Sequence, residues 1–142
     1  LGLTLETRHI LCVPAEHPYW ARNSIHAVMS ATADTRPDAL FIGDEHFASD
    51  VAAALIELGI AIPRDLQVVA HCEFPARDRS PLPFQRIGFD VREVLGAALA
   101  VLRTAIGHAD GITPDSVSVQ PVWEEQVAVV PAPEIGHGMD GF

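Results

Sequence analysis

Two carboxylates and a histidine directly follow a short apolar run in the sequence. Residues 39–47 read ALFIGDEHF, so that apolar residues and one glycine lead into Asp44, Glu45 and His46. Carboxylates accept hydrogen bonds from several hydroxyl groups, and an aspartate can also act as a nucleophile in covalent catalysis. This stretch is therefore a candidate for ligand binding or for catalysis.

Three other apolar runs lead into polar or aromatic residues in the same way. Carboxylates suit a polyhydroxyl ligand, and aromatic rings cover the apolar face of a sugar. The residues concerned are His17, Tyr19 and Trp20 after the run at 9–13, His71, Cys72 and Glu73 after 66–70, and Asp90 after 84–89.

The spacing of these residues disfavours two other kinds of site. His46 and the sequence His-Cys-Glu at 71–73 could in principle gather around a metal ion, but no CxxC or HExxH spacing supports this. Cys72 would need a neighbouring base to act as a nucleophile, and consecutive residues such as His71 point to opposite faces of a strand. We therefore expect no catalytic residue, no metal and no cofactor.

The apolar runs have the lengths of strands, and amphipathic stretches with a helical period lie between them. Three of the runs are nearly all apolar, as expected of strands that are covered on both faces. The expected strands are 9–13, 39–42, 66–70, 84–89, 117–122 and 126–130, and the expected helices are 21–29, 47–58 and 91–106. Strands that alternate with helices predict an α/β fold, a doubly wound parallel sheet with helices on both faces. Ligands bind such sheets at the carboxyl ends of the strands, where the polar residues stand.

Composition excludes several classes of function. The 142 residues are 49% hydrophobic, enough for one globular domain. A formal charge of −10 argues against DNA binding by this segment alone. All nine basic residues are arginine, which excludes Schiff-base chemistry and a Walker lysine.

Cysteine usage and hydropathy indicate a cytoplasmic protein without a membrane contact. Cys12 and Cys72 both lie in apolar runs, which fits reduced thiols better than a disulfide framework. No uninterrupted apolar stretch approaches the ~18 residues that a membrane span needs.

The sequence resembles the lactose/galactose repressor (LacI/GalR) family of bacterial transcription regulators. The resemblance rests on PDALFIGDEHFASDVAAALIELGIAIPRDLQVVAHCEFP followed by SPLPFQRIGFDVREVLGAALAVL, and GIAIPRDLQVV is its most specific part. The regulatory region of that family is a two-lobed, periplasmic-binding-protein-like clamshell, preceded by a helix-turn-helix. The resemblance implies that residues 1–130 form the C-terminal lobe of such an effector-binding and dimerisation domain, and we expect residues 131–142 to be a flexible tail.

The resemblance also implies ligand-binding roles for particular residues. Asp44 stands where family members place an Asn or Asp that binds the effector, and Tyr19 or Trp20 stands near a stacking aromatic, with the spacing off by about two residues. Cys72 replaces an aspartate that binds sugar hydroxyls. Because a thiol is a weak hydrogen-bond partner, either Glu73 substitutes for it or the ligand differs from the usual hexoses. Asp90 takes the place of a frequent glutamine.

Simpler readings exist for some of these residues. Asp44 or Glu45 can cap the helix that begins near His46, and Asp90 can cap the next helix in a capping box with Glu93. Tyr19 and Trp20, at a helix start, can pack against the sheet.

The implied function is regulation by a small polar, carbohydrate-like effector. The resemblance implies a homodimer, formed through 49–58 and 74–83, and operator DNA as a partner only through an N-terminal domain not present in this chain. The expected interface residues are Ser49, Ala52, Ala53, Phe74 and Leu82, because small and apolar residues suit a contact surface. The alternative is a small α/β hydrolase- or phosphatase-like enzyme with Asp44 as nucleophile. The absence of lysine and of a GxSxG motif weighs against this enzyme.

Overall fold

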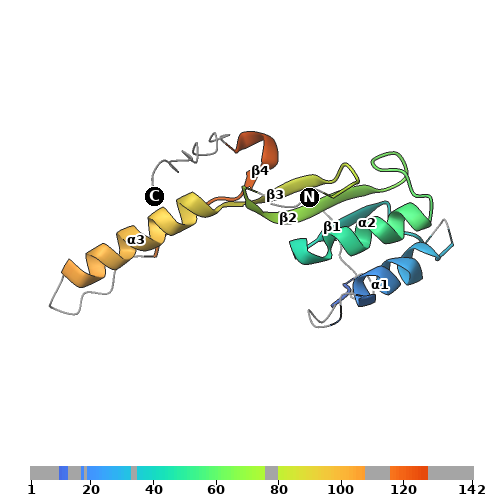
Figure 1. Cartoon of the computed structure of the whole chain (residues 1–142), viewed down its shortest axis with the longest axis horizontal. Coiled ribbons are helices and arrows are strands. Elements are labelled where there is room, and N and C mark those ends of the chain that lie inside the picture. Colours follow the sequence, from blue (N-terminus) through green and yellow to red (C-terminus); the bar gives the residue numbers. More distant parts are fainter. Residues whose placement is uncertain are drawn as a thin grey trace, which may run out of the picture.

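The computed structural model of the chain describes residues 10–12, 17, 19–32, 35–75, 80–107 and 116–127 (Figure 1). In chain order, its elements are α1 (Tyr19–Met29), β1 (Ala39–Ile42), the 3₁₀ turn η2 (Glu45–Phe47), α2 (Ala48–Glu57), β2 (Gln67–Phe74), β3 (Gln85–Asp90), α3 (Val91–Gly107), β4 (Val122–Trp123) and the 3₁₀ turn η3 (Glu124–Gln126).

The four strands form one sheet in the order β1-β2-β3-β4. The first three strands are parallel, with Ile42 opposite Ala70 and Phe74 opposite Asp90, whereas the short β4 is antiparallel to β3. The chain therefore has the predicted α/β fold, with a mostly parallel sheet. The carboxyl ends of β1, β2 and β3 lie at the same end of this sheet, which we call the carboxyl edge.

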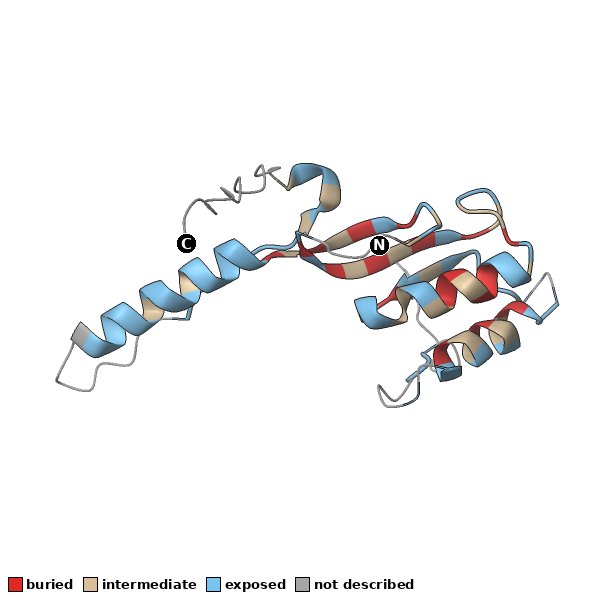
Figure 2. Cartoon of the chain, viewed as in Figure 1, coloured by how far each residue is buried: buried red, intermediate tan, exposed pale blue. Residues whose placement is uncertain are grey.

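One face of the sheet packs against α2 to form the core. Alternate residues of β2, from Val68 to Phe74, are buried on this face together with Leu55 of α2 and Ile25 of α1. Figure 2 shows these buried positions where β2, α2 and α1 face one another, with α1 beside α2. Gly59, with a φ of 67°, adopts the left-handed conformation that ends helices, and the helix predicted at 47–58 ends just before it.

The helix predicted at 91–106 is present as α3, but it extends away from the sheet (Figure 1). No loop separates Asp90 at the end of β3 from Val91 at the start of α3, so the helix cannot reverse direction and lie over the sheet. Within the described residues, the second face of the sheet therefore lacks a covering helix. Phe41, for example, is 63% exposed on this face.

Three of the predicted strands differ from the structure. Residues 10–12 are exposed and irregular, and the rest of the predicted strand 9–13 lies outside the described residues. Of the strand predicted at 117–122, only Val122 lies in a strand, as the first residue of β4, because Pro121 lacks the backbone N–H that a ladder requires. Of 126–130, Gln126 belongs to η3, and residues 128–130 lie outside the described residues, as does the predicted tail.

Two further sequence expectations concern membranes and thiols. No helix among the described residues has the length and apolar character to cross a membrane. Cys12 and Cys72 are both free thiols, but only Cys72 is buried.

Candidate functional site

The turn after β1 is organised by hydrogen bonds between Asp44 and His46. The Asp44 carboxylate caps η2, because its Oδ1 accepts the backbone N–H of His46 at 2.9 Å. The same oxygen lies 2.7 Å from His46 Nδ1. These hydrogen bonds lower the pKa of Asp44 and raise the pKa of His46. The capping role is thus present, and Oδ2 has no hydrogen-bond partner among the described residues.

Glu45 holds this turn against the end of β2. Its Oε2 accepts the backbone N–H of Glu73 at 3.1 Å, which brings residues 44–46 next to Glu73. The predicted grouping of polar residues at one edge is therefore confirmed for the ends of β1 and β2. No three histidine, cysteine or acidic side chains gather closely enough to hold a metal ion in the described part of the chain.

Asp90 ends β3 at the same edge, but its carboxylate is occupied locally. Oδ1 accepts the backbone N–H and the Nε–H of Arg92, both at 2.9 Å. The side-chain hydrogen bond with Arg92 lowers the pKa of Asp90. The predicted capping role is therefore observed, with Arg92 as the partner of Asp90, whereas the sequence had suggested Glu93.

Cys72 and His71 point to opposite faces of β2, as expected of consecutive strand residues. Cys72 is only 5% exposed, within the core below the edge, and burial raises the pKa of its thiol. His71 lies on the open face, where its ring makes an edge-to-face contact with Phe89 at 6.0 Å. Cys72 is therefore not positioned on the exposed edge, and Glu73 is the exposed carboxylate beside it.

Tyr19 and Trp20 form the first turn of α1 and are 75% and 57% exposed. The simpler reading, in which they pack against the sheet, is therefore wrong. The Trp20 ring stacks on His17, with ring centroids 6.5 Å apart. Figure 1 shows that α1 and α2 begin at the same end of the sheet, which is the end where β3 leads into α3. Trp20 thus lies in the first turn of a helix that packs beside α2.

Comparison of the sequence with protein families gives one match, over residues 3–124, to the periplasmic binding protein-like domain. The chain belongs to this family. Its sheet, with polar residues at the carboxyl edge, is that of a periplasmic-binding-protein-like domain. No curated protein matches the sequence.

Solved structures share the fold of this periplasmic-binding-protein-like domain. A LacI family transcriptional regulator from Lactobacillus casei with bound glucose is 18% identical, with a TM-score of 0.58 over 75% of this chain and 37% of that one. The same regulator with bound sucrose is 18% identical, with a TM-score of 0.59 over 82% and 44%. An uncharacterized protein from Actinobacillus succinogenes is 20% identical, with a TM-score of 0.54 over 66% and 34%. The chain thus spans less than half the length of each.

The expected dimer residues of the domain differ in exposure. Ser49 is exposed on α2, and Ala53 and Leu82 are partly exposed. Ala52 and Phe74 are buried in the core, so the expectation that they form part of an exposed contact patch is wrong. Alternation along β2 and the helical period of α2 direct these two side chains into the chain's own interior.

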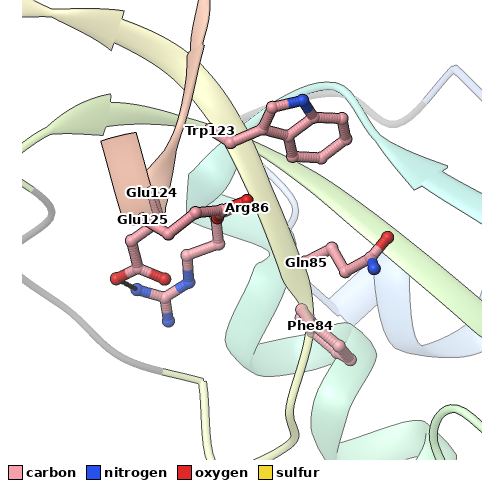
Figure 3. Close-up of a pocket in the computed structure, with 6 residues that line it drawn as sticks. All are labelled: Phe84, Gln85, Arg86, Trp123, Glu124 and Glu125. Carbon is pink, nitrogen blue, oxygen red and sulfur yellow. Dashed lines mark ion pairs between the residues drawn. The ribbon is translucent and has the colours of Figure 1, made fainter. Parts of the chain in front are cut away.

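Sequence reasoning missed a pocket at the other end of β3. It has a volume of about 340 Å³ and is lined by Phe84, Gln85, Arg86, Trp123, Glu124 and Glu125 (Figure 3). The available signal was a single arginine, Arg86, inside an otherwise mostly apolar strand.

Proposed function

We propose that this chain is the effector-binding and dimerisation part of a LacI-type bacterial transcription regulator. The effector is a small polar metabolite of sugar-like chemistry, and it controls DNA binding by a helix-turn-helix outside this chain. The observation that carries the proposal is the hydrogen bond from Glu73 to Glu45, which gathers Asp44 and Glu73 at the carboxyl edge. The glucose and sucrose bound to the L. casei regulator of the same fold support it.

The carboxyl edge has the groups that a polyhydroxyl ligand requires. Asp44 Oδ2 can accept a hydroxyl hydrogen bond while Oδ1 remains bound to His46. The Glu73 side chain is exposed beside it, and we assign to Glu73 the hydroxyl-binding role that the thiol of Cys72 fills poorly. Trp20 supplies an exposed ring for the apolar face of the ligand. Cys72 packs in the core below this edge. Asp90 caps the start of α3.

The exposed apolar surface of α3 supports a two-lobed arrangement. Residues spaced by three or four positions form a stripe along this helix, and an apolar stripe of this kind normally packs against another element. In the proposed clamshell, a second lobe covers the stripe and closes the cleft over the carboxyl edge. The exposed residues of the stripe are Val91, Leu95, Leu102 and Ile106.

A homodimer is the second part of the proposal. Ser49 and Ala53 of α2 and Leu82 before β3 remain accessible for a twofold contact. Sedimentation at about 100 μM, where interfaces of roughly 8 kcal/mol already populate dimers, should show a dimer. A strict monomer at that concentration would refute this part alone.

We propose that the chain is not an enzyme. A phosphatase-like mechanism with Asp44 as nucleophile needs cationic groups to stabilise developing charge. Among the described residues, the contact of the Asp44 carboxylate with a basic side chain is that of Oδ1 with His46 Nδ1, and no arginine lies beside it. No observation favours the hydrolase alternative.

A ligand screen tests the proposed function. Thermal unfolding of a longer protein that contains this chain should shift upward with one class of neutral mono- or disaccharide, because a ligand stabilises the state that it binds. The isolated chain has one wall of the cleft and should respond weakly. A screen in which the longer protein responds to phosphoesters or acyl esters by hydrolysing them would favour the enzyme.

A further inference from the structure

The pocket at the start of β3 lies in a gap in the sheet. β4 pairs with β3 only at Trp123 with Ile87 and at Val122 with Gly88. One further step of this antiparallel register would place Glu124 opposite Arg86, but the chain there turns away as η3. The pocket follows the edge of β3 where η3 leaves it, at the end of the strand opposite to Asp90. It is therefore separate from the carboxyl edge.

Arg86, which lines this pocket, is a buried cation with an unused hydrogen-bond donor. The residue is 8% exposed, and its Nη1 has no hydrogen-bond partner. Glu124 Oε1 lies 3.5 Å from Nη1, which is an ion pair without a hydrogen bond. Buried donors in folded proteins are nearly always hydrogen bonded. An oxygen atom that entered this pocket would therefore form a charge-assisted hydrogen bond with Arg86.

The other residues of the pocket limit the chemistry of the ligand. The lining holds two carboxylates, Glu124 and Glu125, against one guanidinium, and Glu124 already pairs with Arg86, so an anion would be repelled. A hydroxyl group suits both the guanidinium and the carboxylates, because it accepts a hydrogen bond from arginine and donates one to a carboxylate. Trp123 and Gln85 also line the pocket and add an indole and an amide to it, and Figure 3 shows them on the other side of β3 from Arg86.

We infer that this pocket is a second ligand site, which binds a small neutral polyhydroxyl compound of the sugar class. Its volume of about 340 Å³ lies in the range of ~300–1,000 Å³ that is typical of small-molecule sites. The inference does not depend on the proposed function, because no residue of the carboxyl edge lines the pocket.

Fluorine NMR can observe the two sites separately. The chain has two tryptophans, Trp20 in α1 and Trp123 in the pocket, so labelling with 5-fluorotryptophan gives one signal for each. Trp20→Phe and Trp123→Phe assign the signals. Titration with glucose, sucrose and other neutral mono- and disaccharides should shift the Trp123 signal saturably. The inference is overturned if no sugar shifts this signal, or if inorganic phosphate alone does so.

Variants then test the residue that carries the inference. Arg86→Met should weaken the sugar affinity reported by Trp123 by about tenfold or more, as expected for the loss of a charged hydrogen bond. Arg64→Met, which removes an exposed arginine outside the pocket, should leave that affinity unchanged. If Arg86→Met does not fold, Glu125→Ala at an exposed position gives the same test. Wild-type affinity in a folded pocket variant would overturn the inference.

Discussion

The carboxylate of Glu45 accepts a hydrogen bond from the backbone N–H of Glu73, with 3.1 Å between Oε2 and the nitrogen. This contact joins the turn after β1 to the end of β2. The placement of Asp44 beside Glu73, on which the proposed effector site depends, therefore depends on Glu45 as well.

Loss of this contact should loosen the turn. Glu45→Ala removes the acceptor of the Glu73 N–H and should lower the free energy of unfolding by about 1 kcal/mol. Glu45→Gln keeps an oxygen at the same reach and should remain near the wild type. Urea denaturation measures both values, and equal stability of the two variants would argue against the contact.

Truncation of a side chain on the interior face of α2 should lower the stability far more than truncation on its outer face. Leu55 is fully buried in the core, and Leu55→Ala should cost about 2–5 kcal/mol because it leaves a cavity. Its neighbour Ile56 is exposed, and Ile56→Ala should change the stability by less than about 0.5 kcal/mol. Similar losses at both positions, measured by chemical denaturation, would contradict the packing described above.

Two glycines should respond to alanine with opposite signs. A Cβ on Gly88 would lie 1.6 Å from the carbonyl oxygen of Cys72, so Gly88→Ala must force β2 and β3 apart. We expect a loss of more than about 4 kcal/mol, or failure to fold. A Cβ on Gly96 meets nothing within 4 Å, and Gly96→Ala should stabilise α3 by up to about 1 kcal/mol. Thermal unfolding of both variants tests the register between β2 and β3.

The Asp44–His46 pair should make stability depend on pH. The hydrogen bond with Asp44 raises the pKa of His46 above its usual 6.5 in the folded state. The stabilisation is therefore complete below pH 6.5 and is lost as the pH rises through the folded-state pKa. NMR titration of the imidazole should show the raised pKa, and Asp44→Ala should return it toward 6.5. An unchanged His46 pKa in that variant would show that the pair does not form in solution.

Local signals explain which parts of the fold could be predicted from the sequence. The run at 39–42 coincides with β1, and Gly59 marks the end of α2. Both signals are local, because the spacing of apolar residues and the conformation of a glycine each involve only a few consecutive residues. The grouping of Asp44 with Glu73 was also predictable. Parallel strands bring their carboxyl ends to one edge whatever the details of packing.

Long-range packing explains what could not be predicted. Ala52 and Phe74 are apolar residues whose burial is decided by contacts between α2 and β2, so composition alone suggested an exposed patch. The direction of α3 follows from the direct continuation of β3 into the helix, with no turn between Asp90 and Val91. The pocket at Arg86 arises because η3 leaves the sheet after two paired residues, which no local pattern indicates.

The most direct test of the proposed function is the effector affinity of a regulator that contains this chain, measured by calorimetry for the wild type and for Asp44→Ser. Serine caps a helix start about as well as aspartate but removes the carboxylate, so the fold should be preserved. We predict that the effector binds more weakly by roughly 1.5–3 kcal/mol, the value of a hydrogen bond to a charged group. The operator affinity of the unliganded protein should not change. Unchanged effector affinity would contradict the account and leave Asp44 as a cap for η2.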